Sequence, residues 1–220
     1  MSTASLHAAQ RADHLASMAD PRGVDVLVIG GGVTGAGIAL DAATRGLTTA
    51  IVEAQDWASG TSSRSSRLVH GGLRYLYNLD FKLVAEALHE RGLLLTKLAP
   101  HLVKAQPLLW PFRQPVIERG YSTLGVGLYD AMALVVSRFH AAVPIQRHLS
   151  KKAALANSPS LDPASLVGAM IYHDARVDDA RLVITLVRTA VANGALAASR
   201  VSVVRLTKDA AGRVSGAVVR

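Results

Sequence analysis

Residues 24–40 read Val-Asp-Val-Leu-Val-Ile-Gly-Gly-Gly-Val-Thr-Gly-Ala-Gly-Ile-Ala-Leu, and this stretch decides the fold. Its first six residues are mostly apolar and β-branched, which is typical of a parallel strand covered on both faces. Gly30, Gly32 and Gly35 then follow the pattern Gly-x-Gly-x-x-Gly. The first glycine of that pattern permits a tight turn, the second lets backbone approach a pyrophosphate, and the third lets helix and strand pack closely. The stretch therefore predicts a phosphate site at a helix N-terminus.

The residues after this turn complete a βαβ unit. A helix is expected over residues 34–45, and Gly46 suits the left-handed position that ends many helices. A second strand, 48–52, delivers Glu53 to its C-terminal edge, 18 residues after Gly35. At about this spacing a carboxylate accepts hydrogen bonds from the ribose of a dinucleotide. A carboxylate repels a 2′-phosphate, so FAD or NAD is favoured over NADP. The alternative reading is a chance glycine turn.

The composition describes a globular chain. Of the 220 residues 50% are hydrophobic and 18% charged, which argues against disorder. The longest apolar stretch, 124–136, is too short for a bilayer and contains Asp130. Residues 1–22 lack the apolar segment of a signal peptide. Cysteine is absent, which excludes disulfides and thiolate metal sites and fits a cytoplasmic location.

The charge is unevenly distributed. Lys and Arg number 24 against 16 acids, a net charge of +8, which suits nucleic acid, an anionic membrane or anionic small molecules. No acid lies between Asp56 and Asp80, where Arg64, Arg67 and Arg74 stand among Ser, Gly and Tyr. This mixture favours a pocket for phosphates, although a plain basic surface is the alternative reading. Because only 5% of residues are aromatic, we expect no nucleic-acid partner.

The chain is expected to divide into four segments. Residues 1–22 are predicted to be a flexible N-terminal extension. Residues 23–100 form the first part of the dinucleotide-binding domain, 101–173 a separate inserted lobe that prolines break into short pieces, and 174–220 the continuation of the first domain. The pattern predicts helices over 81–97, 124–138 and 180–192, and hairpin strands over 198–206 and 214–219. Because Arg220 follows a strand with no turn or polar tail, we expect the N-terminal part of a longer protein.

Several motifs together resemble one family, the FAD-dependent glycerol-3-phosphate dehydrogenases of the glutathione-reductase-like flavoprotein superfamily. They are the glycine-rich stretch at 28–47, Val-Glu-Ala-Gln-Asp at 52–56, Gly-Thr-Ser-Ser-Arg-Ser-Ser-Arg-Leu-Val-His-Gly-Gly-Leu-Arg-Tyr-Leu at 60–76, Ala-Pro-His-Leu at 99–102 and Val-Asp-Asp-Ala-Arg-Leu at 177–182. The serine-rich stretch is specific to this family among flavoproteins. The resemblance implies an α/β fold, a glutathione-reductase-like FAD-binding Rossmann domain with an inserted substrate lobe, truncated at the C-terminus.

The resemblance also implies the site residues. Arg74 would pair with the substrate phosphate through its planar fork, and Tyr75 would lie beside it. Alternatively, His70 only holds a turn and Tyr75 is a core residue, while Arg64 and Arg67 depart mildly from the family pattern. The implied FAD-binding set is Gly30, Gly32, Gly35, Glu53, Ala54, Thr61, Ser62, Ser66, His70, Gly71, Gly72, Leu73 and Val203. The catalytic histidine is expected outside this chain.

The implied reaction is oxidation of sn-glycerol 3-phosphate to dihydroxyacetone phosphate. Hydride would pass to FAD N5 and electrons to quinone, with a peripheral contact at the inner face of the cytoplasmic membrane. Two other enzyme readings remain open, an FAD oxidoreductase of the amine or hydroxy-acid oxidase type and an NAD dehydrogenase. The third alternative is a non-enzymatic basic binding module. The long Ser/Arg loop after Glu53 disfavours NAD.

Overall fold

The computed structural model describes residues 5–76, 78–114, 117–136 and 142–220, without the side chains of Arg74 and Val136. It divides the chain into two compact units. The first comprises Met1–Ser66 with Asp178–Arg220, and the second comprises Arg67–Val177. Each unit is described by itself. The division differs from the expected one, because residues 67–100 belong to the second unit rather than to the dinucleotide-binding domain.

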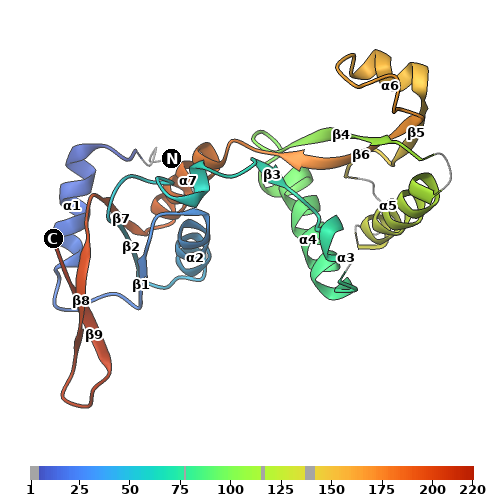
Figure 1. Cartoon of the computed structure of the whole chain (residues 1–220). Helices are drawn as coiled ribbons and strands as arrows, with labels where there is room; N and C mark the ends of the chain where they lie inside the picture. Colours follow the sequence, from blue (N-terminus) through green and yellow to red (C-terminus); the bar gives the residue numbers. More distant parts are fainter. Residues whose placement is uncertain (1–4, 77, 115–116, 137–141) are drawn as a thin grey trace. The chain divides into compact units, whose positions relative to one another are not determined.

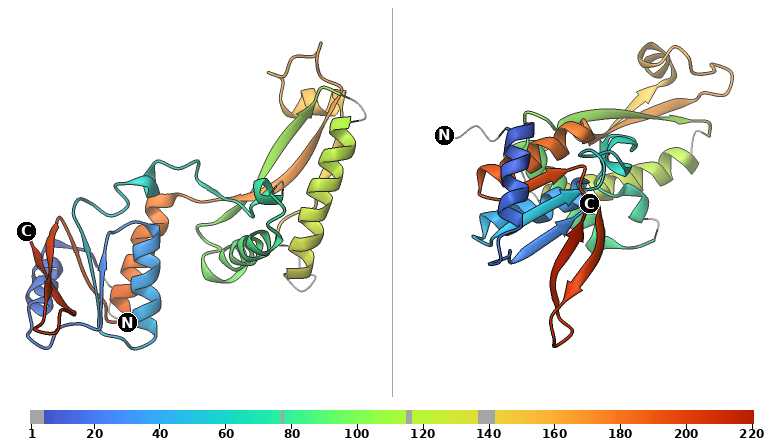
Figure 2. Two further views of the ribbon diagram at one scale, coloured as in Figure 1. Left: turned by 60° about the horizontal axis from the view of Figure 1, so that its bottom comes forward. Right: turned by 90° about the vertical axis from the view of Figure 1, so that its left-hand side faces the viewer.

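The first unit contains a parallel three-stranded sheet. Its strands are β1 (Val26–Ile29), β2 (Thr49–Glu53) and β7 (Leu196–Ser199), in the order β1-β2-β7. Helices α2 (Val33–Thr44) and α7 (Asp179–Ala192) lie side by side on one face of the sheet (Figures 1 and 2). The buried core between these layers is formed mostly by small and β-branched residues, including Val28, Ala36, Ala39, Ile51, Val183, Val187 and Ala197. Small alanines on α2 let the helix lie close to the strands.

The βαβ prediction is confirmed within one or two residues at each boundary. Helix α2 ends at Thr44, and Gly46 has a φ of +82°, the left-handed conformation that favours glycine. Helix α7 is also confirmed, with Asp178 as N-cap accepting a hydrogen bond from the N–H of Arg181. These boundaries follow from local signals.

The N-terminal segment is not a flexible extension. It forms α1 (Ala8–Met18), on the face of the sheet opposite α2 and α7. Leu15 and Met18 of α1 pack against the buried side chains of Val52 and Ala198. The prediction was wrong because the partners of α1, Val52 and Ala198, lie far away in the sequence.

Polar contacts add to this packing. The Arg11 Nε donates to the carbonyl oxygen of Ser199 at 2.7 Å, and its Nη2 donates to that of Arg200 at 3.1 Å. The N–H of Ala197 donates to His14 Nδ1 at 2.9 Å. Helix α1 is therefore anchored along strand β7.

The predicted strand over 198–206 is also wrong, because it is two strands. Strand β7 ends at Ser199, and Arg200 adopts a left-handed φ of +55° that turns the chain. A new strand, β8 (Val203–Lys208), then pairs antiparallel with β9 (Val214–Val219). The hairpin itself was predicted correctly.

The second unit is built on an antiparallel sheet. The central strand β6 (Gly168–Arg176) pairs on one side with β4 (Lys104–Phe112). On its other side it pairs with β3 (Leu68–Val69) and β5 (Arg147–Ser150). Strand β4 is thus an edge strand among the described residues.

Pro107 and Pro111 do not break this segment as expected, whereas Pro144, Pro159 and Pro163 lie outside helices and strands and Pro115 lies outside the described residues. Pro107 and Pro111 lie inside β4, opposite His173 and Ala169 of β6. The carbonyl of Phe112 bonds toward β6, so by strand alternation the two prolines face away from the ladder, where no N–H is needed. An edge position therefore tolerates both.

Helices cover one side of this sheet (Figure 1). They are α3 (Leu73–Leu76), α4 (Phe81–Leu93) continued by the π-helical turn η2 (Leu94–Leu98), and α5 (Ile117–Val136). A short helix, α6 (Lys151–Asn157), follows β5. The helix predicted over 81–97 is confirmed, and the one predicted over 124–138 begins seven residues earlier. Within the ranges that the structure describes, no helix has the length and apolarity needed to cross a membrane.

The anchoring of α1 gives a first prediction. Replacing Arg11 by Ala should speed hydrogen exchange of the α1 amides about 30-fold, because two hydrogen bonds to backbone carbonyls, each worth about 1 kcal/mol, are lost. Arg22→Ala is the matched control, since the exposed side chain of Arg22 lies outside α1 and pairs with the half-buried Asp20. Equal exchange in the two variants would show that Arg11 does not hold the helix.

Candidate functional site

The glycine-rich loop joins β1 to α2 and sets the geometry of the first candidate site. Gly30 has a φ of +117°, and its N–H donates to the carbonyl of Val52 at 2.8 Å. The N-cap of α2, Gly32, offers no side chain to the helix. The N–H of Val33 instead donates to Ser62 Oγ at 2.9 Å. The helix N-terminus therefore faces a short polar turn, η1 (Thr61–Ser63).

Close packing explains the glycines of this loop. A Cβ on Gly35 would stand 2.0 Å from the carbonyl oxygen of Gly30, and one on Gly31 would stand 2.5 Å from the Trp57 ring. A Cβ on Gly32 would lie 3.2 Å from Ser62 Oγ, on the side that faces η1. The third glycine of the motif thus has the helix-packing role predicted for it.

Glu53 stands at the end of β2, as predicted, and contacts the loop directly. Its Oε2 accepts from the N–H of Gly31 at 2.6 Å, and its Oε1 accepts from the N–H of Gln55 at 2.7 Å. The carboxylate therefore ties β2 to the glycine-rich turn. Each carboxylate oxygen retains a second lone pair that a ligand hydroxyl can use.

One cavity collects most of the predicted residues of the first unit. Its lining comprises Gly30, Gly31, Gly32, Glu53, Ala54, Gln55, Ser59, Gly60, Thr61 and Ser62. Gly35 lies on the neighbouring groove, which shares Gly30, Gly32, Thr61 and Ser62. The cavity has hydroxyls from Ser59, Thr61 and Ser62, and the groove adds apolar side chains such as Val28 and Ile38. Neither lining has a cationic side chain among the described residues, so an anion there would be held by the helix N-terminus.

Two predicted residues of the first unit lie outside both the cavity and the groove. Ser66 is exposed at the end of the first segment of the unit. Val203 begins β8 and packs against Val52, Ala198 and Val201. Their predicted contacts with a cofactor stay predictions.

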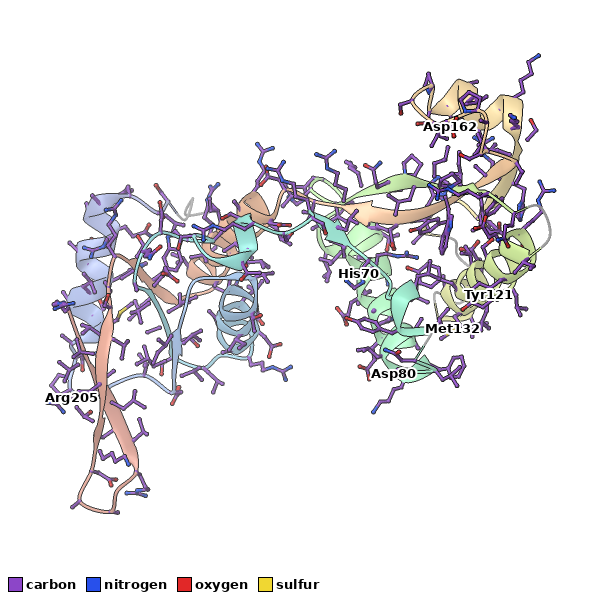
Figure 3. All side chains as sticks on the ribbon, viewed as in Figure 1. His70, Asp80, Tyr121, Met132, Asp162 and Arg205 are labelled. Carbon is purple, nitrogen blue, oxygen red and sulfur yellow. The ribbon has the colours of Figure 1, made fainter. Side chains whose placement is uncertain are left out.

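The second group of predicted residues, His70 to Tyr75, belongs to the second unit. The chain turns at Gly72, which has a φ of +83°, and the N–H of Tyr75 donates to the carbonyl of Gly72 at 2.7 Å. The rings of His70 and Tyr75 are 6.2 Å apart between centroids, and His70 lies where β3 leads to α3 (Figure 3). Leu73 begins α3. The Arg74 side chain lies outside what the structure describes.

A buried polar network holds this turn. Asp174 Oδ1 accepts from Arg91 Nη1 at 2.5 Å, from Tyr129 Oη at 2.8 Å and from the N–H of Gly71 at 3.0 Å. Arg91 Nη1 also donates to Tyr129 Oη at 2.9 Å, and its guanidinium carbon lies 5.3 Å from the Tyr129 ring centroid. The side chains of Arg91 and Asp174 are 2% and 5% exposed. The network joins α4, α5 and β6 at the turn.

Burial shapes the electrostatics around this network. It raises the pKa of Tyr129, so the phenol stays protonated and donates to Asp174. Burial likewise raises the pKa of Asp130, whose Oδ2 accepts from the N–H of Gln146 at 2.8 Å. In contrast, a buried Arg is always charged and needs its acid beside it.

Sequence reasoning missed Arg91, Tyr129 and Asp174. One signal was present for Arg91, because it continues the apolar stripe of Val84 and Leu88 on α4. A charge on an apolar stripe indicates a buried partner. No sequence signal pointed to Asp174, which lies 83 residues further along the chain.

The packing of the glycine loop gives a second prediction. Gly35→Ala should lower the free energy of unfolding by about 1–3 kcal/mol, because its Cβ meets backbone that cannot move aside. Gly37→Ala is the control on the same helix: its Cβ has open space and should stabilise by about 0.5–1 kcal/mol. Denaturant unfolding of both variants measures the difference. Equal stabilities would contradict the close approach.

Comparisons with known proteins agree with this geometry. The family model described as FAD dependent oxidoreductase matches residues 25–220. The chain is 53% identical over 196 residues to a glycerol-3-phosphate dehydrogenase of Mycobacterium leprae, covering 89% of this chain and 32% of that protein. It is 42% identical to the probable mitochondrial glycerol-3-phosphate dehydrogenase of Caenorhabditis elegans, covering 96% and 29%.

Solved structures give the same result. The chain matches the glycerol-3-phosphate dehydrogenase of Bacillus halodurans complexed with FAD at 33% identity and a TM-score of 0.66, over 96% of this chain and 33% of that one. A match to L-α-glycerophosphate oxidase of Mycoplasma pneumoniae, at 19% identity and a TM-score of 0.64, covers 86% and 48% and shows the fold alone.

The chain thus spans about a third of the length of the curated relatives that it matches. Within that span the family model covers nearly every residue, including the glycine loop, Glu53 and the His70–Tyr75 turn. The predicted cofactor, FAD, is the one that the family description names. The chain belongs to the FAD dependent oxidoreductase family.

Proposed function

We propose that the gene product oxidises sn-glycerol 3-phosphate to dihydroxyacetone phosphate with FAD as cofactor. The proposal rests most directly on the 53% identity to a mycobacterial glycerol-3-phosphate dehydrogenase over 89% of the chain. The motif His-Gly-Gly-Leu-Arg-Tyr at 70–75 adds to it. When bound, FAD supplies the redox step, accepting a hydride at its N5.

The donor set of the first unit fits the dinucleotide part of FAD. The pyrophosphate would use the N-terminus of α2 with Gly30, Gly32, Thr61 and Ser62, where side chains leave room and the helix dipole favours an anion. Glu53 would accept from the adenosine ribose hydroxyls, and Ala54 lines the same cavity. Ser66, His70, Gly71, Gly72, Leu73 and Val203 are the further proposed contacts.

The substrate side is assigned to Arg74 and Tyr75. Both belong to α3, directly after Gly72. An arginine binds a phosphate through two parallel hydrogen bonds, and a tyrosine adds a hydroxyl beside it. These residues would bind and orient the substrate rather than move protons.

Electrons would leave the flavin for a membrane quinone. A quinone dissolves in the bilayer, so the enzyme would make a peripheral contact with the inner face of the cytoplasmic membrane. The chain's net charge of +8 suits an anionic leaflet. The test is reduction of a short-chain quinone by glycerol 3-phosphate, with and without anionic vesicles.

The activity itself has a direct test. The purified full-length gene product should be yellow, and glycerol 3-phosphate should bleach its flavin absorption bands anaerobically. Glycerol and glycine are the controls, because glycerol has the secondary alcohol but lacks the phosphate, and glycine lacks both. Bleaching by glycine alone would replace this proposal by an amine oxidase.

Glu53 gives a third prediction. Glu53→Gln should weaken FAD by about 1.5–3 kcal/mol, roughly 10- to 150-fold, since a charge-assisted hydrogen bond to the ribose is lost. Flavin retention after extensive dialysis measures this. Asp56→Asn removes a neighbouring charge whose carboxylate accepts a hydrogen bond from the N–H of Trp57, and it should retain flavin. Equal flavin retention in the two variants would contradict the proposed hydrogen bond between Glu53 and the ribose.

Arg74 gives a fourth prediction. Arg74→Ala should lower kcat/KM for glycerol 3-phosphate by about 2–4 kcal/mol, roughly 30- to 1,000-fold, because a phosphate–guanidinium pair is lost in a partly dry site. Arg74→Lys should recover only part, since an ammonium keeps the charge but not the fork. Steady-state kinetics with an artificial acceptor measure both. A loss below threefold at normal flavin content would make Arg74 structural.

A further inference from the structure

We propose that Arg91, Tyr129 and Asp174 are positioning residues that fix the His70–Tyr75 turn for substrate binding. This inference rests on the proposed function for its kinetic consequence. Its structural content does not, because the network and the turn lie in the same unit. None of the three side chains is assigned a contact with substrate or flavin.

The network holds the turn through one atom. Asp174 Oδ1 accepts from the N–H of Gly71 while also accepting from Arg91 and Tyr129. Three donors converging on one oxygen fix the position of that oxygen. The N–H of Gly71 is therefore held at a defined place between α4, α5 and β6.

Sterics hold the turn from the other side. A Cβ on Gly71 would stand 2.2 Å from Tyr129 Oη and 2.4 Å from Leu88 Cδ2. The backbone of Gly71 thus lies directly against the hydroxyl that donates to Asp174. The turn cannot move inward, and the hydrogen bond opposes movement outward.

The constraint passes along a short path to the substrate residues. Gly71 and Tyr75 are separated by three residues, and the N–H of Tyr75 closes a turn onto the carbonyl of Gly72. Beyond it, the N–H of Asp80 donates to the carbonyl of Tyr75, and the Asp80 carboxylate caps α4. Arg74 and Tyr75 therefore stand on a backbone segment anchored at both ends.

Stability alone is a poor account of this arrangement. A buried ion pair is costly to desolvate, and an apolar replacement of equal volume is often as stable. What an apolar core cannot provide is an acceptor for the N–H of Gly71. The network is thus suited to defining a conformation, and it lies next to the segment where a conformation matters.

The test compares Tyr129→Phe with Asp130→Asn. Phenylalanine keeps the ring and removes only the hydroxyl that bonds Asp174 and Arg91. Asp130 is the matched control, because it is the next residue of α5, is buried, and accepts a backbone N–H from Gln146 instead of Gly71. Both are measured in the full-length holoenzyme, per bound flavin.

Two readouts are expected to move in Tyr129→Phe and stay at wild-type values in Asp130→Asn. Amide exchange of residues 70–76 should become about tenfold faster, as expected for one buried hydrogen bond. KM for glycerol 3-phosphate, measured per bound flavin, should rise about tenfold while kcat falls by a smaller factor, because Arg74 and Tyr75 are displaced together with the turn. A lower Tm with unchanged exchange and unchanged KM would overturn the proposal.

A second variant keeps the proposal testable if Tyr129→Phe fails to fold. Arg91→Lys keeps a positive charge near Asp174, but its side chain is one bond shorter, so its ammonium nitrogen does not reach the place where Arg91 Nη1 contacts Asp174, Tyr129 and the carbonyl of His173. It should shift exchange and KM in the same direction, and wild-type values of both would overturn the proposal. If the wild-type protein does not oxidise glycerol 3-phosphate, the proposed function fails, and the exchange comparison still decides the positioning role.

Discussion

The first unit depends on the contact between the backbone of Gly35 and the carbonyl of Gly30. With 2.0 Å available for a Cβ, α2 can lie against the loop only without a side chain there. This close contact places the N-terminus of α2 over the end of β1. The alanines of α2 continue the close packing of the helix along the sheet. Glu53 then reaches the N–H of Gly31 from β2. The anion-binding geometry is a consequence of helix packing.

The second unit uses a different constraint for its functional segment. Its turn at Gly71 is positioned by a charged cluster in the interior rather than by close backbone packing. Interior charges bind donors strongly because water does not compete, and for the same reason an incomplete set is costly. The predicted cofactor residues of each unit therefore reach defined geometry by different physical means.

The βαβ unit could be predicted from the sequence because its signals are local. Gly30 and Gly46 adopt backbone conformations with positive φ, and Gly35 packs closely against Gly30. Each of these glycines therefore depends on residues near it in the sequence. Predictions failed where distant segments decide. The sequence pattern predicts breaks at Pro107 and Pro111, yet their place at a sheet edge depends on β6, more than fifty residues later. The ion pair between Arg91 and Asp174 likewise forms only when the chain has folded. Its only sequence signal is the charge of Arg91 on the apolar face of α4.

The docking of α1 has a consequence for behaviour in solution. Strand β7 borders the sheet among the described residues, and the outer row of a border strand is a template for other chains. Arg11 and His14 engage the main chain of β7 at Ser199, Arg200 and Ala197. An incoming strand would have to displace these side chains first. The N-terminal helix thus hinders intermolecular β-pairing at β7. A protein that lacked this helix would be expected to aggregate before it lost its fold.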